Sequence, residues 1–189
     1  MRPDVQTCGI ANETEDGFFV FVADYDGVAL ARVEKDLLHL NRVFGLCSFA
    51  ILENSHVDIM GADGRVEPVG NYNVIGLDKL PFAVCEDAIN HTRCDAAFAG
   101  HVRHYPQRNR VIRILEKVAL KGKETIRPAP KLLKIVKFPC VTCRGYYHSS
   151  AHKALISRYF GAVWGYMGRM DGLREVELVM YRTQRKPKV

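Results

Sequence analysis

The order of hydrophobic patterns between residues 18 and 115 restricts the possible folds of this chain more than any other feature. Residues 18–23 (FFVFVA) form a short apolar run of aromatic and β-branched side chains, which predicts a buried central strand. Residues 30–44 then carry apolar side chains at intervals of three and four, which predicts an amphipathic helix. Gly45 follows where a helix C-cap is expected.

The pattern continues with two strands, a helix and a fourth strand. Residues 47–52 and 72–77 are predicted strands joined by a long, glycine-containing hairpin connection. Residues 81–90 predict a helix with proline in its first turn, and residues 111–115 predict the next strand. The order β-α-β-β-α-β is that of ferredoxin-like and RNA-recognition-motif (RRM-like) folds. We therefore expect an α+β fold with both helices on one face of the sheet and the other face open.

The chain is expected to have two parts. Residues 1–118 form the predicted RRM-like core domain. Residues 119–189 form a basic C-terminal extension packed on the core, with a proline-containing connector followed by a strand, a helix and a strand at 132–138, 149–170 and 175–181.

Charge is distributed unevenly along the chain. The net charge is +6, but residues 1–100 hold 7 Lys and Arg against 16 Asp and Glu, whereas residues 101–189 hold 20 against 5. A basic half that gathers on one face creates a strongly positive field, and its natural ligand is nucleic acid, either DNA or RNA. The alternative is a set of solvated Lys and Arg side chains scattered over the surface.

The composition also bears on the compartment. The chain contains no apolar run of 18 residues, and its first residues are polar and acidic, so we expect no membrane partner and no secretory signal. Most of the six cysteines lie within apolar segments, which is typical of buried thiols in a reducing compartment. The predicted location is the cytoplasm.

An acid pair ends the first predicted strand. Asp24 and Asp26 are two residues apart, so on a regular strand their side chains point the same way. Such a pair can chelate Mg²⁺ or Mn²⁺, which prefer oxygen ligands and nucleotide phosphates. The alternative interpretation is an acidic turn after a strand.

Four segments carry a resemblance to a known family. These are FVADYDG at 21–27, GNYNVIG at 70–76, CDAAF at 94–98 and RVIRILEK at 110–117. Together they resemble the catalytic module of the archaeo-eukaryotic primase superfamily, which includes small primase-polymerases of archaeal plasmids and viruses.

The resemblance implies nucleotidyl transfer of the DNA primase or polymerase type, dependent on Mg²⁺ or Mn²⁺. It implies that Asp24, Asp26 and Asp95 hold the metal ions. It also implies that Asn73, Arg113 and Lys117 contact the nucleotide, with the two basic side chains neutralising triphosphate charge.

Two alternatives remain open. Asn73 stands where the superfamily places a histidine, and an amide carries no charge, so the chain is alternatively a non-catalytic nucleic-acid-binding or ribonucleoprotein subunit that kept the fold. The segment DYDGVAL also resembles the first motif of haloacid-dehalogenase-like phosphatases. The chain contains no Gly-Asp dipeptide for the later acidic motif of those enzymes, and the predicted element order does not suit their parallel sheet.

The stretch HVRHYPQRNR at 101–110 contains no acid. Arg103, Arg108 and Arg110 are predicted to contact phosphates, and Tyr105 to stack on a base. The alternative is an exposed, mobile loop.

A cysteine and histidine group follows near the C-terminus. Cys140, Cys143, His148 and His152 combine a Cys-x-x-Cys pair with two histidines, the residue types that bind Zn²⁺ tetrahedrally. Against a zinc site, the histidines lie where a helix is expected to begin, and the spacing between the two ligand pairs is short.

Overall fold

The structure is a computed structural model, and it describes residues 6–60, 66–100, 110–114, 117–121, 123–139, 148–161 and 178–182. No helix in these ranges is long and apolar enough to cross a membrane.

The first part of the fold follows the predicted order, with longer strands than expected. Its elements are β2 (Phe19–Ala29), α1 (Leu30–Phe44), β3 (Ser48–Met60), β4 (Val66–Leu80) and α2 (Phe82–Asn90). Helix α1 ends at Gly45, which adopts a left-handed conformation with φ of 75° and donates its N–H to the carbonyl oxygen of Asn41 at 2.9 Å. Glycine reaches this conformation without steric cost, so the predicted C-cap is confirmed.

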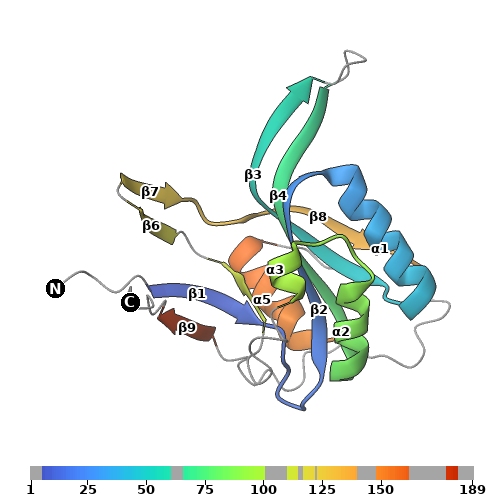
Figure 1. The fold of residues 1–189 in the computed structure, drawn as a ribbon. Coiled ribbons are helices and arrows are strands. Elements are labelled where there is room, and N and C mark those ends of the chain that lie inside the picture. Colours follow the sequence, from blue (N-terminus) through green and yellow to red (C-terminus); the bar gives the residue numbers. More distant parts are fainter. Residues whose placement is uncertain are drawn as a thin grey trace.

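The remaining elements complete the described structure (Figure 1). They are β1 (Gln6–Ala11), α3 (Ala96–Ala99), β5 (Val111–Arg113), β6 (Lys117–Lys121), β7 (Lys123–Arg127), β8 (Lys131–Lys137), α5 (Ser150–Phe160) and β9 (Leu178–Arg182).

The described strands form three antiparallel sheets. Their orders are β2-β4-β3-β8, β5-β1-β9 and β6-β7. The α+β class is confirmed, but the ferredoxin-like order is not, because β5 pairs with β1 instead of extending the main sheet beside β2. Strand β2 therefore lies at one end of the described order and is not central, although residues 20–23 are buried as predicted.

One face of the main sheet packs against α1 and α2. The buried side chains between these layers include Tyr25 and Phe49 from the sheet, Leu37 from α1 and Ile89 from α2. This cluster explains why the apolar positions of α1 recur at intervals of three and four, since those positions face the sheet. Both predicted helices thus cover the same face.

The other face of the main sheet carries a second core. Val22 and Ile75 on this face pack with Ile112 of β5 and Ile156 of α5. The expectation of a broadly open face is therefore wrong, because β5 and α5 bring apolar side chains that bury much of it. Strand β8 completes the main sheet by pairing with β3 from Ser48 to Glu53.

Strands β3 and β4 continue beyond the sheet as a two-stranded ribbon, defined here as residues 54–60 and 66–71. The ribbon projects from the rest of the protein (Figure 1). Its register runs from Ser55 opposite Asn71 to Met60 opposite Val66. The hairpin connection expected from the sequence is thus mostly strand.

Candidate functional site

Two of the three predicted metal-binding acids lie side by side. The backbone N–H of Asp95 donates to the carbonyl oxygen of Asp24 at 2.7 Å. Asp95 is the N-cap of α3, and its Oδ1 accepts the N–H of Phe98 at 2.8 Å. Asp is favoured at this position because its carboxylate satisfies a free N–H of the first turn. The cap therefore fixes one carboxylate oxygen of Asp95.

Asp24 begins a polar row across the second face of the main sheet, defined as Asp24, Asn73, Asn54 and Arg113. Asp24 is directly opposite Asn73 in the β2–β4 register, so their side chains share a face. Nδ2 of Asn73 and Nη2 of Arg113 both donate to Oδ1 of Asn54, each at 3.4 Å. Nη1 of Arg113 donates to the carbonyl oxygen of Pro128 at 2.8 Å. The row thus spans four strands, β2, β4 and β3 of the main sheet and β5 of the second sheet.

Asp26, two residues after Asp24, lies at an irregularity in β2. The register with β4 shifts between Tyr25 and Val28, and Gly27 adopts a φ of 63°. The N–H of Gly27 donates to Oδ1 of Asn71 at 2.7 Å. Asp26 is exposed, whereas Asp24 is half-buried. The bulge begins after Tyr25, so the regular alternation assumed for this pair ends at Asp26.

The three acids do not fit the predicted Mg²⁺ or Mn²⁺ site. Within the described ranges, no group of three or more His, Cys, Asp or Glu side chains is placed to hold a metal ion. One carboxylate oxygen of Asp95 is held by its capping bond, and Asp26 is exposed at the bulge. We therefore derive no reaction step through a metal.

The pKa of the half-buried Cys94 thiol reflects its burial and the charges around it, including those of Asp24 and Asp95. Burial raises the pKa of Cys94, and the carboxylates of Asp95 and Asp24 raise it further. Hydrogen bonding to Thr92 and the positive charge of Arg110 act in the opposite direction. The thiol is therefore held in its protonated, weakly nucleophilic form.

The predicted phosphate contact at Arg110 is wrong. The side chain of Arg110 is almost completely buried and forms an ion pair with Glu86. Its guanidinium also donates to the carbonyl oxygens of Phe98 at 3.3 Å and Ala99 at 3.0 Å. Arg110 thus ties the end of α3 to α2, because a buried charge needs such partners.

Several other predicted residues lie outside the described ranges. They are Arg103, Tyr105 and Arg108 of the basic loop, and Cys140 and Cys143 of the zinc hypothesis. The backbone of Lys117 is described, at the first position of β6 opposite Arg127.

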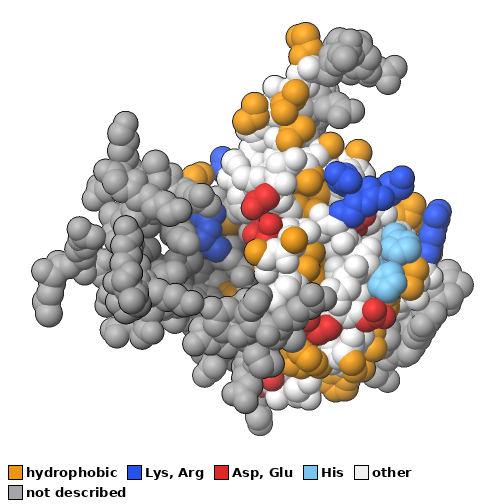
Figure 2. All heavy atoms as spheres, viewed as in Figure 1, with side chains coloured by type: hydrophobic (Ala, Val, Ile, Leu, Met, Phe, Trp, Pro, Cys, Tyr) orange, Lys and Arg blue, Asp and Glu red, His pale blue; other side chains and the backbone are white. Residues whose placement is uncertain are grey.

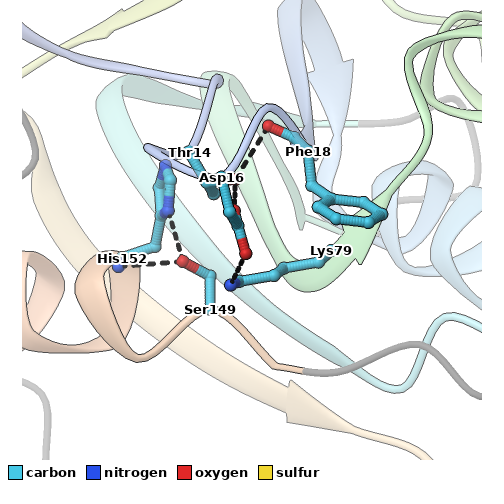
Figure 3. Close-up of polar contacts among 6 residues, drawn as sticks. All are labelled: Thr14, Asp16, Phe18, Lys79, Ser149 and His152. Atoms are coloured by element: carbon cyan, nitrogen blue, oxygen red, sulfur yellow. Dashed lines mark hydrogen bonds and ion pairs between the residues drawn. The ribbon is translucent and has the colours of Figure 1, made fainter. Parts of the chain in front are cut away.

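The two histidines of the zinc hypothesis have other partners (Figure 3 draws the second). Nδ1 of His148 lies 3.2 Å from Oδ1 of the buried Asp78. His152 is completely buried, with Nδ1 at 2.7 Å from Oγ of Ser149 and Nε2 at 2.9 Å from the carbonyl oxygen of Ala11. Both ring nitrogens of His152 are therefore occupied, and this residue does not fit a zinc ligand.

A basic surface that the sequence analysis missed lies on α1. Arg32, Lys35, His39 and Arg42 are exposed and recur at intervals of three and four on the side of α1 away from the core. Figure 2 shows Lys and Arg side chains gathered over this region beside histidine side chains.

The segment after α2 extends this surface. The rings of His39 and His91 stack with centroids 5.9 Å apart, and His91 also contacts the edge of Phe44. The backbone N–H of Arg93 donates to Oδ2 of the buried Asp36 at 2.9 Å, which places the exposed Arg93 beside α1. We call the set of Arg32, Lys35, His39, Arg42, His91 and Arg93 the α1 basic surface.

The four Lys and Arg side chains of the α1 basic surface form no ion pair with a described residue. Of the acids on α1 and α2, Asp36 is buried, Glu34 is paired with Lys134, and Oδ1 of Asp87 lies 3.5 Å from Nδ1 of His91. The signal for this surface was present in the spacing of the basic positions of α1. The surface was not predicted because the net charge of residues 1–100 as a whole is negative.

Comparisons of the chain with protein-family models, with curated proteins and with solved structures gave no match.

Proposed function

We propose that this chain is a nucleic-acid-binding protein that contacts the phosphate backbone through the α1 basic surface. The observation that carries the proposal is the exposure of four Lys and Arg side chains without ion-pair partners among the described residues, beside two exposed histidines. Free surface cations of this kind bind phosphates and release condensed counterions, which is the main source of affinity for nucleic acids.

The dimensions of the surface suit a stretch of backbone. Arg32 and Arg42 are ten residues apart on one helix, which corresponds to about 15 Å along its axis. One strand of B-form DNA carries a phosphate every 3.4 Å or so of axial rise, so this length matches about four phosphates. The stacked rings of His39 and His91 add a flat surface between the cations.

The test is the salt dependence of binding, measured by fluorescence anisotropy with labelled single-stranded and duplex oligonucleotides. We expect the double variant Arg32→Ala/Lys35→Ala to bind more weakly. The slope of log K against log salt should fall in magnitude by about 1.4 for single strands or about 1.8 for duplex DNA, because two phosphate contacts are lost.

The control is Lys79→Ala, which removes a cation of β4 that does not belong to the α1 basic surface. Nζ of Lys79 is 2.5 Å from a carboxylate oxygen of Asp16, so this cation is already neutralised within the protein. We expect the control to keep the wild-type slope. Equal slopes for the double variant, the control and the wild type would contradict the proposal.

Metal-dependent nucleotidyl transfer is the second candidate function. It is favoured by one observation, the 2.7 Å backbone hydrogen bond that brings Asp95 beside Asp24 at the start of the polar row. Against it, the described acids do not form a metal-binding group. A haloacid-dehalogenase-type phosphatase is not proposed, since every strand pairing described is antiparallel.

Primer extension with Mg²⁺ or Mn²⁺ distinguishes the two candidates. If the second candidate holds, the wild type and the control Glu15→Ala extend a primer, and Asp24→Ala does not. Glu15 is an exposed acid in the turn before β2 and does not belong to the polar row, so this variant measures non-specific effects of charge removal. Salt-sensitive binding without extension in any variant supports binding alone.

A further inference from the structure

The ribbon carries apolar side chains that no described part of the protein covers. Val57, Ile59, Met60 and Val66 are 66%, 50%, 73% and 56% exposed, which makes the ribbon the largest concentration of exposed apolar residues in the described structure. An isolated two-stranded ribbon is marginally stable in water, and exposed apolar surface of this kind marks an interaction site.

The outer edge of the ribbon is also open. Strand β3 pairs with β4 on one side along its whole length, but on the other side it pairs with β8 only from Ser48 to Glu53. From residue 54 to residue 60, no described strand pairs with this edge. Unpaired N–H and C=O groups beside β-branched side chains provide a template for an added strand.

The charges of the ribbon argue against nucleic acid as the partner. Residues 54–60 and 66–71 contain two acids, Asp58 and Glu67, and neither Lys nor Arg. Residues 61–65, which join them, contribute one acid and one arginine. An apolar, acidic strand edge suits another polypeptide and would repel phosphates.

We propose that the partner is a second copy of this chain, which pairs antiparallel with β3 across a two-fold axis at Val57. Two-fold pairing of identical strands places residues on the same face opposite each other, so the axis passes through one residue. With the axis at Val57, His56 is opposite the second copy's Asp58, and Asp58 is opposite the second copy's His56.

The charges of the strand favour a two-fold axis at Val57 over one at Asp58. An axis at Asp58 would place two carboxylates directly opposite each other, which is destabilising. An axis at Val57 instead pairs two β-branched side chains at the centre and forms the His56–Asp58 contact twice. Within each copy, His56 also lies 3.2 Å from Glu53, so acids face its ring from both chains.

The first experiment is crosslinking by cysteine substitution under mild oxidation. In the proposed register Val57→Cys brings two cysteines directly opposite each other, within the Cα separation of 4.4–6.8 Å or so that a disulfide needs. Ile59→Cys is the matched control, because position 59 is opposite the second copy's Ser55 and the two cysteines would be about 14 Å apart along the strands.

We expect Val57→Cys to give a covalent dimer well above the level of the wild type, whose native cysteines set the background, and Ile59→Cys not to exceed it. Equal crosslinking at both positions would overturn the register. Absence of crosslinking at both would overturn the proposal.

The second experiment is sedimentation equilibrium of nuclease-treated protein. Because one strand pair buries less than the 800 Å² or so per partner of a standard interface, we expect the mass to rise with concentration from 21.3 kDa towards twice that value. Val57→Lys should remain monomeric, since it places two ammonium groups opposite each other on the axis, and its exposed position leaves the fold intact.

A wild type that stays monomeric at all concentrations would contradict the proposal, and the ribbon would then serve a different polypeptide. A dimer that forms only when nucleic acid is added would also contradict it, because a shared ligand would hold the copies together. Neither result bears on the α1 basic surface, which is tested separately by its salt dependence.

Discussion

At the scale of single residues, His152 is a completely buried polar side chain with a hydrogen-bond partner at each ring nitrogen. Its burial lowers its pKa, while the hydrogen bond to the carbonyl oxygen of Ala11 acts in the opposite direction. The geometry fits a neutral ring that donates from Nε2 to the carbonyl oxygen of Ala11. At Nδ1 the ring accepts the hydroxyl proton of Ser149 (Figure 3). His152 therefore joins α5 to the end of β1.

This arrangement predicts a loss of stability in mild acid. The pKa of His152 in the folded state lies below its unfolded value near 6.5, so the unfolded chain binds the proton more readily. Its contribution is complete above pH 6.5 or so and decreases as the pH falls, by at most about 1.4 kcal/mol per pH unit. Urea unfolding at several pH values measures this loss.

The control for this measurement is His39→Gln, which removes an exposed imidazole. We expect His152→Gln to be less stable than the wild type at pH 8 and to depend less on pH between 7 and 5. His39→Gln should keep the wild-type dependence. An unchanged pH profile in His152→Gln would show that another group causes the loss.

Single residues also show where sequence patterns mislead. Arg110 was predicted to contact phosphates because its neighbours in sequence are basic, and His152 was weighed as a zinc ligand because two cysteines and a histidine lie nearby. Both side chains are instead buried and bonded to backbone carbonyls, of Ala99 for Arg110 and of the distant Ala11 for His152. Periodicity reports which residues face a core, but it does not report which carbonyl groups a tertiary contact brings to a buried donor.

At the scale of elements, the root of the ribbon depends on Gly70. A Cβ at this position would lie 2.6 Å from the carbonyl oxygen of Ser55 and 2.8 Å from the ring and hydroxyl oxygen of Tyr72. The first neighbour is backbone and cannot rotate away. The glycine therefore allows the close approach of β3 and β4 where the ribbon leaves the sheet.

We expect Gly70→Ala to lower the free energy of unfolding by about 1 to 3 kcal/mol, the usual cost of overpacking. Ser55→Ala is the control, because it changes an exposed side chain on the facing strand and should stay within about 0.5 kcal/mol of the wild type. Urea denaturation measures both values. If the two variants were equally stable, β3 and β4 would accommodate the added methyl group at position 70 without a loss of folding stability.

The elements that were predicted correctly are those that depend on residues close together in the sequence. Helix α1 and its cap at Gly45 follow from apolar spacing and glycine chemistry alone. The pairing of β5 with β1 did not follow, because no feature of a three-residue strand indicates which edge it will join. The closeness of Asp24 and Asp95 was predicted through a family resemblance, whereas the bulge at Asp26 depends on local backbone geometry.

At the scale of the whole molecule, the main sheet lies between two cores, and the C-terminal part of the chain contributes to the second. Strand β8 pairs with β3 in the main sheet, and Ile156 of α5 is buried among residues from β2, β4 and β5. The predicted boundary at residue 118 therefore separates two parts of the chain that contribute to the same sheet and the same core.

This sharing predicts that residues 1–118 do not fold alone. Without β8 the edge of β3 at Ser48–Glu53 is unpaired, and without α5 the apolar side chains of Val22, Ile75 and Ile112 lose their cover. Unpaired edges and exposed apolar surface favour aggregation over a stable monomer. We expect the fragment to be poorly soluble or to show no cooperative unfolding, whereas the full chain unfolds in one transition detected identically by circular dichroism and tyrosine fluorescence.

Adding a separately produced 119–189 fragment should restore solubility if the two parts assemble through the same contacts. A soluble 1–118 fragment with a cooperative transition of its own would show instead that the first core suffices and that the second is an addition to an independent fold.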